Sequence, residues 1–212
     1  MEKKIKPIFD DTTTVPALLR NVVKHIHPAT ETFLIDKQGT EWVEISFEAT
    51  LSNADAVSAF FLSKGINKGD RMGLMIENGP DYVYYDQGIQ QIGAINVSVY
   101  PTLSEHEVEY IINDSGIKAI LVGNNFLFRK VLKIAATCPS LEFIIPAFDG
   151  FEKISIPEDV KAIVLPFKTI LAQEVTATVA AEIEKRRNEV TPSDLSSLIY
   201  TSGTTGTPKG VM

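Results

Sequence analysis

Apolar residues recur at helical spacing in the first part of the chain and then alternate with polar ones. Residues 15–26, VPALLRNVVKHI, place five apolar side chains on one helical face: Leu18, Leu19, Val22, Val23 and Ile26. TFLID and EWVEISF flank the turn-rich DKQGT, and the alternation in EWVEISF predicts a β-hairpin. A second helix is expected over 48–64, ending at Gly65. Residues 1–69 are therefore predicted to form a helix, a hairpin and a helix.

A different rhythm begins at Asp70. The extended segments RMGLMI, AINVSVY, KAILV and LEFIIPA are separated by stretches with helical periodicity. One of these begins with Ser104 and Glu107, which match a capping box, and ends at Gly116. Strands joined by a helix run in the same direction, so residues 70–148 are predicted to form a parallel α/β unit.

The last part, residues 149–212, starts with a less regular stretch. It continues with the extended KAIVLPF, a helix with one apolar stripe, and the strand SSLIYTS. The stripe consists of Leu171, Val175, Val179 and Ile183. The predicted fold class is thus α/β, a doubly wound parallel sheet preceded by a helix and a β-hairpin.

Charge and composition exclude several classes of protein. With 20 Lys and Arg against 27 Asp and Glu, the net charge is −7, and the compact basic cluster Lys185, Arg186 and Arg187 falls at a predicted helix end. Basic residues there complement the helix dipole, so nucleic-acid binding is not expected. The sequence has no apolar run as long as a membrane span, and we predict a cytoplasmic protein.

The residues that most often carry chemistry give little signal. Cys138 is the one cysteine, and its place between a helical and an extended stretch favours a buried, inert thiol over a nucleophile. His25, His27 and His106 have no partner at ligand spacing, so no metal site is predicted from them. The aromatic residues Tyr84, Tyr85 and Tyr100 are expected in the core rather than around a substrate.

The segment TSGTTGTPKG, residues 201–210, has the strongest chemical character. Its three glycines allow close approach of the backbone to an anion, and its hydroxyl groups and Lys209 are all potential donors. This density of donors after a strand favours a polyphosphate ligand. The spacing is not that of the common P-loop, because Lys209 is followed by glycine and not by Ser or Thr. On composition alone, a flexible Gly/Thr-rich linker remains an alternative.

The string YTSGTTGTPKG resembles, residue for residue, the signature phosphate loop of the AMP-forming adenylating superfamily, which includes acyl-CoA synthetases, luciferases and peptide-synthetase adenylation domains. The stretch from Gly65 to Val122 is similar to the family's region of the same order. VYPTLSEHEVEYIINDS, residues 99–115, most resembles the long-chain fatty-acid:CoA ligase branch.

This resemblance implies a two-step reaction that uses ATP, Mg²⁺ and CoA. A fatty-acid carboxylate attacks the α-phosphorus of ATP, releasing pyrophosphate, and the thiolate of CoA then displaces AMP from the acyl-adenylate. The resemblance also implies that a loop binds the β- and γ-phosphates, and that loop consists of Thr201, Ser202, Gly203, Thr204, Thr205, Gly206, Thr207, Lys209 and Gly210. No residue before 200 is expected to be catalytic.

By the same resemblance, the chain corresponds to the first part of a longer family protein, without the C-terminal half and the lid domain. We therefore expect the 212-residue chain to be inactive by itself. Two alternatives stay open: an adenylating ligase for an aromatic or amino acid, and a short protein that uses the loop only to bind a nucleotide or a partner. A third alternative is that residues 200–212 lack order, because the loop has no downstream strand to pack against.

Overall fold

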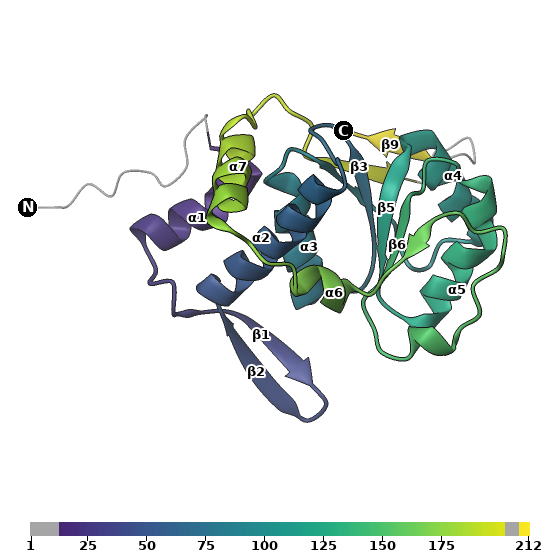
Figure 1. Ribbon diagram of the computed structural model, residues 1–212, viewed down its shortest axis with the longest axis horizontal. Helices are drawn as coiled ribbons and strands as arrows, with labels where there is room; N and C mark the ends of the chain where they lie inside the picture. Colours follow the sequence, from purple (N-terminus) through teal and green to yellow (C-terminus); the bar gives the residue numbers. More distant parts are fainter. Residues whose placement is uncertain (1–12, 202–207) are drawn as a thin grey trace, which may run out of the picture.

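The central feature of the fold is a sheet with helices on both faces (Figure 1). The computed structural model describes residues 13–201 and 208–212. In spatial order, the described strands of this sheet are β7 (Ile163–Val164), β6 (Phe143–Pro146), β5 (Ile117–Val122), β3 (Arg71–Met75), β4 (Ile95–Ser98), β8 (Ser197–Thr201) and β9 (Lys209–Val211). A separate antiparallel pair consists of β1 (Thr32–Gln38) and β2 (Glu41–Ser46).

The helices form one layer on each face of this sheet. In chain order they are α1 (Val15–His25), α2 (Phe47–Ser63), α3 (Pro80–Gln90), α4 (Glu105–Ser115), α5 (Asn125–Ile134), α6 (Phe167–Leu171) and α7 (Ala177–Asn188), with 3₁₀ turns at Ala135–Thr137 and Phe151–Lys153. Figure 1 shows α2 and α3 on one face and α4 and α5 on the other. Two hydrophobic clusters fill the spaces between the sheet and these layers, one around Tyr85 and one around Phe128.

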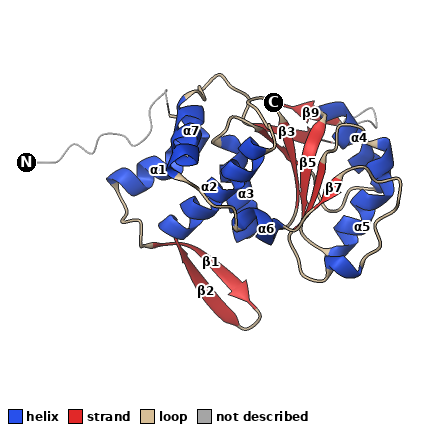
Figure 2. Cartoon of the chain, viewed as in Figure 1, coloured by secondary structure: helices blue, strands red, loops and turns tan. Residues whose placement is uncertain are grey.

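The helix, hairpin and helix predicted at the start of the chain are present. The Ser46 hydroxyl accepts a hydrogen bond from the backbone N–H of Ala49, which caps the start of α2. Figure 2 shows the hairpin projecting from the helical layer. Leu34 and Ile45 pack against the cluster beneath α2, whereas Trp42 on the outer face is 66 % exposed. The hairpin therefore adds one apolar face to the core.

Strands β3, β4, β5 and β6 are parallel, as the alternation of extended and helical segments predicts. Strand β3 lies between β4 and β5, so the connection through α4 crosses over β3. The order in which strands are added across the sheet reverses at this crossover, and right-handed connections then place α3 on one face and α4 and α5 on the other. The doubly wound class is confirmed.

Helix α4 shows how local sequence sets an element's limits. Ser104 and Glu107 form the predicted capping box, in which each side chain bonds the other residue's backbone N–H at 3.3 and 2.8 Å. Gly116 ends the helix with a φ of 70°, a left-handed conformation that favours glycine. Both boundaries were predicted correctly.

The helix expected to carry a stripe from Leu171 to Ile183 is in fact two helices, α6 and α7. Thr176 is the N-cap of α7 and accepts a hydrogen bond from the N–H of Val179 at 3.4 Å. Helix α6 ends five residues earlier and buries Phe167 and Ile170 against the α2 and α3 layer. The continuous stripe was misleading because the capping threonine interrupts the helix without interrupting the apolar spacing.

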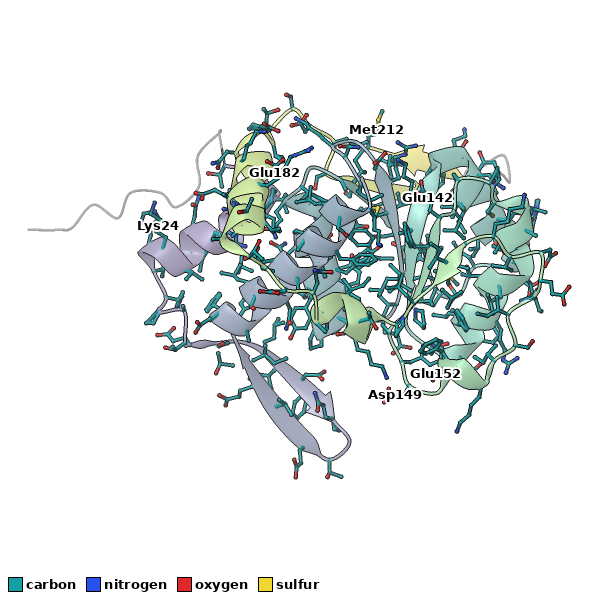
Figure 3. All side chains as sticks on the ribbon, in the orientation of Figure 1. Lys24, Glu142, Asp149, Glu152, Glu182 and Met212 are labelled. Atoms are coloured by element: carbon teal, nitrogen blue, oxygen red, sulfur yellow. The ribbon has the colours of Figure 1, made fainter. Side chains whose placement is uncertain are left out.

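Charged side chains lie mainly at the periphery. Figure 3 shows Lys24 on α1 and Glu182 on α7 pointing away from the body of the molecule. The basic cluster lies in the last turn of α7, as predicted, and Arg186 there donates a 2.7 Å hydrogen bond to Glu182. None of the helices in the described part of the chain combines the length and apolar character needed to cross a membrane.

Candidate functional site

Strand β8 brings the glycine- and threonine-rich segment to the carboxyl edge of the sheet. It is parallel to β4, so its end lies at the same edge as the ends of β3, β4 and β5. Ligands bind preferentially at this edge in open α/β sheets. The predicted ligands from Ser202 to Thr207 lie outside the described residues, whereas Thr201, Lys209 and Gly210 are placed.

Residues 209–211 form β9, which pairs with β8 in the antiparallel direction. Thr201 and Lys209 are cross-strand partners, so the two ends of the intervening segment are neighbours. The alternative that residues 200–212 lack order therefore does not hold for the described part, because β8 itself provides the strand against which β9 packs.

Side-chain alternation divides this hairpin between the two faces of the sheet. Paired residues of antiparallel strands share a face, so Thr201 and Lys209 project together. Both side chains are exposed, and Lys209 has no hydrogen bond or ion pair with any other described residue. A hydroxyl group and an ammonium group are thus available on one face, next to the loop.

On this same face, a groove of about 490 Å³ opens at the ends of β3, β4 and β8. Leu74, Ser98 and Ile199 line its floor, and Tyr82 and Tyr100 are among the residues at its sides. Ile199 is 42 % exposed, so β8 is only partly covered here. The groove and the two donors beside the loop lie on the same face of the sheet, and together they form the candidate site.

The three tyrosines singled out from the sequence have different environments. Tyr84 and Tyr85 are buried, as predicted, and belong to the cluster beneath α2. Tyr100 is 53 % exposed and borders the groove, so its prediction as a core residue is wrong. It follows β4 and precedes α4, where the chain turns over the sheet edge instead of continuing under a helix.

A row of polar side chains leads from the groove into the layer between α3 and β4. The Asp86 carboxylate accepts hydrogen bonds from Asn96 at 2.6 Å and Gln90 at 2.7 Å. Ser98, in the groove, donates to Asn96, and Ser196 donates to Gln90. Burial raises the pKa of Asp86, although the hydrogen bonds from Asn96 and Gln90 act in the opposite direction. The row ties α3 to β4 and to the start of β8, and the sequence pattern did not reveal it.

Gly210 has a structural role beside the contact with phosphate predicted from the sequence. It pairs with Tyr200, and a Cβ atom at Gly210 would lie 3.2 Å from the Tyr200 ring. The Tyr200 hydroxyl donates a 2.6 Å hydrogen bond to Asp114 on α4. Sequence analysis missed both Tyr200 and Asp114, because they are 86 residues apart and no local pattern connects them.

Cys138 is buried, as predicted, and lies outside this site. Desolvation is the main reason that its thiol pKa is raised to about 11, with a smaller contribution from Glu109. The thiol is therefore protonated near neutral pH, in agreement with an inert role. Groups of three or more His, Cys, Asp or Glu side chains that could hold a metal ion do not occur among the described residues.

Comparison with known proteins identifies relatives for nearly the whole chain. The family model described as AMP-binding enzyme matches residues 20–212. Fatty acyl-CoA synthetase A of Dictyostelium discoideum is 31 % identical over 186 residues, covering 84 % of this chain and 26 % of the relative. The long-chain-fatty-acid–CoA ligase of Bacillus subtilis is 28 % identical over 184 residues, covering 80 % and 32 %.

Solved structures agree with this relationship. The anthranilate CoA ligase in complex with anthranoyl-AMP gives a TM-score of 0.73 at 25 % identity, over 96 % of this chain and 35 % of that one. The adenylation domain of a carboxylate reductase from Mycobacterium chelonae gives 0.71 at 18 % identity, over 97 % and 35 %, and supports the fold alone. The chain spans about a quarter to a third of the length of the curated relatives it matches.

Proposed function

Because the chain belongs to the family of AMP-binding enzymes, we propose that it is the amino-terminal part of an ATP-dependent, AMP-forming acyl-CoA synthetase. The proposed reaction activates a fatty acid in two steps. Its carboxylate oxygen attacks the α-phosphorus of ATP and pyrophosphate leaves. The CoA thiolate then attacks the acyl carbon, and the bond to AMP breaks.

The observation that carries this proposal is the placement of Thr201 and Lys209. They flank the loop as cross-strand partners, project from one face, and lie on the face that carries the groove. An ammonium group and hydroxyl donors suit the β- and γ-phosphates of ATP, whose negative charge grows on the departing pyrophosphate. We propose the same role for the predicted ligands from Ser202 to Thr207 and for Gly210.

The proposed reaction also requires Mg²⁺ and CoA. Mg²⁺ would supply charge neutralisation at the phosphates. The described residues offer no cluster of carboxylates for it, so we assign none of them as its ligand. We also assign no residue in the described part of the chain to CoA binding. The contribution proposed for this chain is therefore to bind and orient the polyphosphate.

We propose a long-chain fatty acid as the substrate, because the relatives include a long-chain-fatty-acid–CoA ligase. Medium-chain acyl-CoA ligases of mammals are also similar, at 29 % identity for the rat protein. The structural similarity to an anthranilate CoA ligase specifically favours an aromatic carboxylate as the second candidate. The two candidates differ in the acid that supports adenylation.

The test is carboxylate-dependent exchange of labelled pyrophosphate into ATP by the complete ligase. Fatty acids of increasing length and anthranilate would be compared. We expect the highest kcat/KM with a long-chain fatty acid, and a preference for anthranilate would contradict that assignment. The 212-residue chain by itself is expected to show no exchange, because it spans about a quarter to a third of the length of these relatives. Clear exchange by this chain would contradict the proposed inactivity.

A variant connects the activity to the candidate site. Lys209→Gln removes the ammonium group beside the loop, and we expect exchange to fall about a hundredfold, as when one charge-stabilising donor is lost. Lys168→Gln is the matched control. Lys168 lies on α6, and its exposed side chain is near Asp149. Equal activities of the two variants would contradict the proposed role of Lys209.

A further inference from the structure

The Tyr200 side chain connects two elements that flank the loop. It leaves β8 on the face covered by α4 and α5, where its ring is 6 % exposed within the cluster around Phe128. Its hydroxyl donates a 2.6 Å hydrogen bond to Oδ2 of Asp114, near the end of α4. A residue one position before Thr201 is therefore tied to a helix of the rigid core.

The same ring also determines what can stand at position 210. A Cβ at Gly210 would lie 3.2 Å from Cζ and 3.4 Å from the hydroxyl oxygen of Tyr200. The distance to Cζ is shorter than most Cβ contacts, so a side chain at position 210 would require the ring to shift by a few tenths of an ångström, which strains its hydrogen bond to Asp114. Glycine is needed here for close approach of the ring, and no positive φ is involved.

Strand β9 is short and lies at one end of the described sheet. Its three residues are exposed, and within the described chain β8 is its one strand neighbour. A short edge strand of this kind opens easily unless a side chain fixes it. Tyr200, held at its hydroxyl by Asp114 and covering Gly210, provides that fixed point.

We propose that Tyr200, Asp114 and Gly210 form a positioning clamp that holds β9 against β8 and thereby places Lys209 for the polyphosphate of ATP. The inference rests on the proposed function, because it assigns a role in ATP binding to the clamp. The Tyr200 side chain lies on the face of the sheet opposite to Lys209. Tyr200 and Asp114 are positioning residues, which act through Lys209 and do not touch the nucleotide.

The electrostatics of the tyrosine agree with this role. Desolvation by the surrounding cluster raises the pKa of Tyr200, and the negative charge of Asp114 raises it further. The hydroxyl therefore keeps its proton across the physiological range and remains a donor. A phenylalanine would fill the same space in the cluster but would leave the ring without its tie to α4.

Tyr110 provides a matched control on the same carboxylate. Its hydroxyl lies 3.5 Å from Oδ1 of Asp114, but its side chain belongs to α4 itself. Tyr110→Phe and Tyr200→Phe each remove one hydroxyl from the surroundings of Asp114. The clamp predicts an effect on β9 for the second variant alone.

The first measurement is backbone amide exchange of residues 209–211 in the 212-residue chain. We expect Tyr200→Phe to accelerate this exchange about tenfold, the effect of losing one hydrogen bond that closes the strand. Tyr110→Phe should match the unaltered chain. Unchanged exchange in Tyr200→Phe would overturn the clamp.

The second measurement is made in the complete ligase and separates positioning from general stability. Tyr200→Phe should raise KM for ATP about tenfold and leave KM for the fatty acid unchanged. Equal changes in both KM values would indicate a general loss of structure and overturn the inference. If the unaltered ligase has no ATP-dependent activity, the proposed function fails, and the role in placing Lys209 for ATP fails with it. The exchange result then decides whether the clamp holds β9.

A double variant tests whether the three residues act together. Gly210→Ala should raise KM for ATP by itself, because the new methyl group displaces the ring. Added to Tyr200→Phe, it should have little further effect, since the hydrogen bond is already lost. Fully additive effects would contradict a shared clamp.

Discussion

At the scale of single residues, Asp86 is a carboxylate whose surroundings are largely desolvated. It accepts two amide hydrogen bonds, from Asn96 and Gln90, between α3 and β4. Burial nevertheless dominates and raises its pKa above the ordinary value of 3.8. The folded protein therefore binds a proton at this carboxyl group more tightly than the unfolded chain does.

This proton affinity gives a prediction for pH dependence. The stability contributed by protonated Asp86 is fully present below its unfolded pKa and is lost as pH rises through its folded pKa. Asp86→Asn keeps an oxygen that accepts from Asn96 but cannot titrate. We expect the unfolding free energy of the unaltered chain to fall relative to the variant from about pH 4 to pH 7. Urea unfolding at each pH measures the unfolding free energy of both proteins. Parallel pH profiles of the unaltered chain and the variant would contradict the prediction.

The residue scale also shows what spacing cannot reveal. Thr201 and Lys209 were singled out as members of the predicted phosphate loop, because they belong to one short segment with a recognisable sequence. Asp114 belongs to the same structural unit but lies far away in sequence. Its contribution depends on where α4 lies, and nothing in its own neighbourhood distinguishes it from an ordinary surface carboxylate.

At the scale of elements, the closest packing of two helices is between α2 and α3. A Cβ added to Gly88 on α3 would lie 2.5 Å from Cβ of Val57 and 2.8 Å from the backbone oxygen of Ala54, both on α2. The Ser58 hydroxyl donates to the Gly88 carbonyl at 2.7 Å, so the two backbones are in near contact. Glycine at position 88 sets the distance between the helices.

Gly88→Ala should therefore destabilise the fold, although alanine normally favours a helix. The gain in helix propensity is about 1 kcal/mol. The separation of α2 and α3 should cost about 1 to 3 kcal/mol and outweigh this gain, leaving a net loss of up to about 2 kcal/mol in the free energy of unfolding. Gly79→Ala is the control, because a Cβ there meets no atom within 4 Å. Urea denaturation compares them, and a more stable Gly88→Ala chain would contradict this packing argument.

Elements were predicted well where their signals are local. The capping box of α4 and its terminal Gly116 are examples, because the groups involved lie within one helix. The break between α6 and α7 was missed because Val175 continues an apolar spacing across a capping threonine. Strand β9 was missed because it exists by pairing with β8, and its three residues have no alternation long enough to detect.

At the scale of the whole molecule, one polar network joins four helices. Asp55 on α2 contacts Arg20 of α1 and accepts a 2.8 Å hydrogen bond from Gln91, which follows α3. Arg187 of α7 donates to the same glutamine. Desolvation lowers the pKa of Arg187, and the neighbouring Arg20 lowers it further. Asp55 therefore pairs with the Arg20 guanidinium group and also acts on the Arg187 guanidinium group, which has Glu184 as a second carboxylate nearby.

Asp55→Ala is expected to loosen the attachment of α1 and α7. It leaves the partly buried Arg20 guanidinium group without its ion-pair partner and removes one of the two carboxylates near Arg187, which should reduce the unfolding free energy by about 1 to 3 kcal/mol. Asp149→Ala is the control, because this carboxylate is fully exposed and 3.8 Å from Lys168. Urea unfolding of both variants gives the comparison. Equal stabilities would show that the network does not hold the helices together.

The sequence by itself determined the class of the fold, the direction of the central strands and the segment that marks the family. These properties follow from local periodicity, from turn residues, and from the rule that a helical crossover keeps strands parallel. The division at residues 69 and 148 stays a prediction. Tertiary structure alone decided the order of the strands, the exposure of Tyr100 and the contact of Tyr200 with Asp114 and Gly210. Strands pair through backbone groups that are alike in every strand, so their order depends on packing between distant residues that no local pattern records.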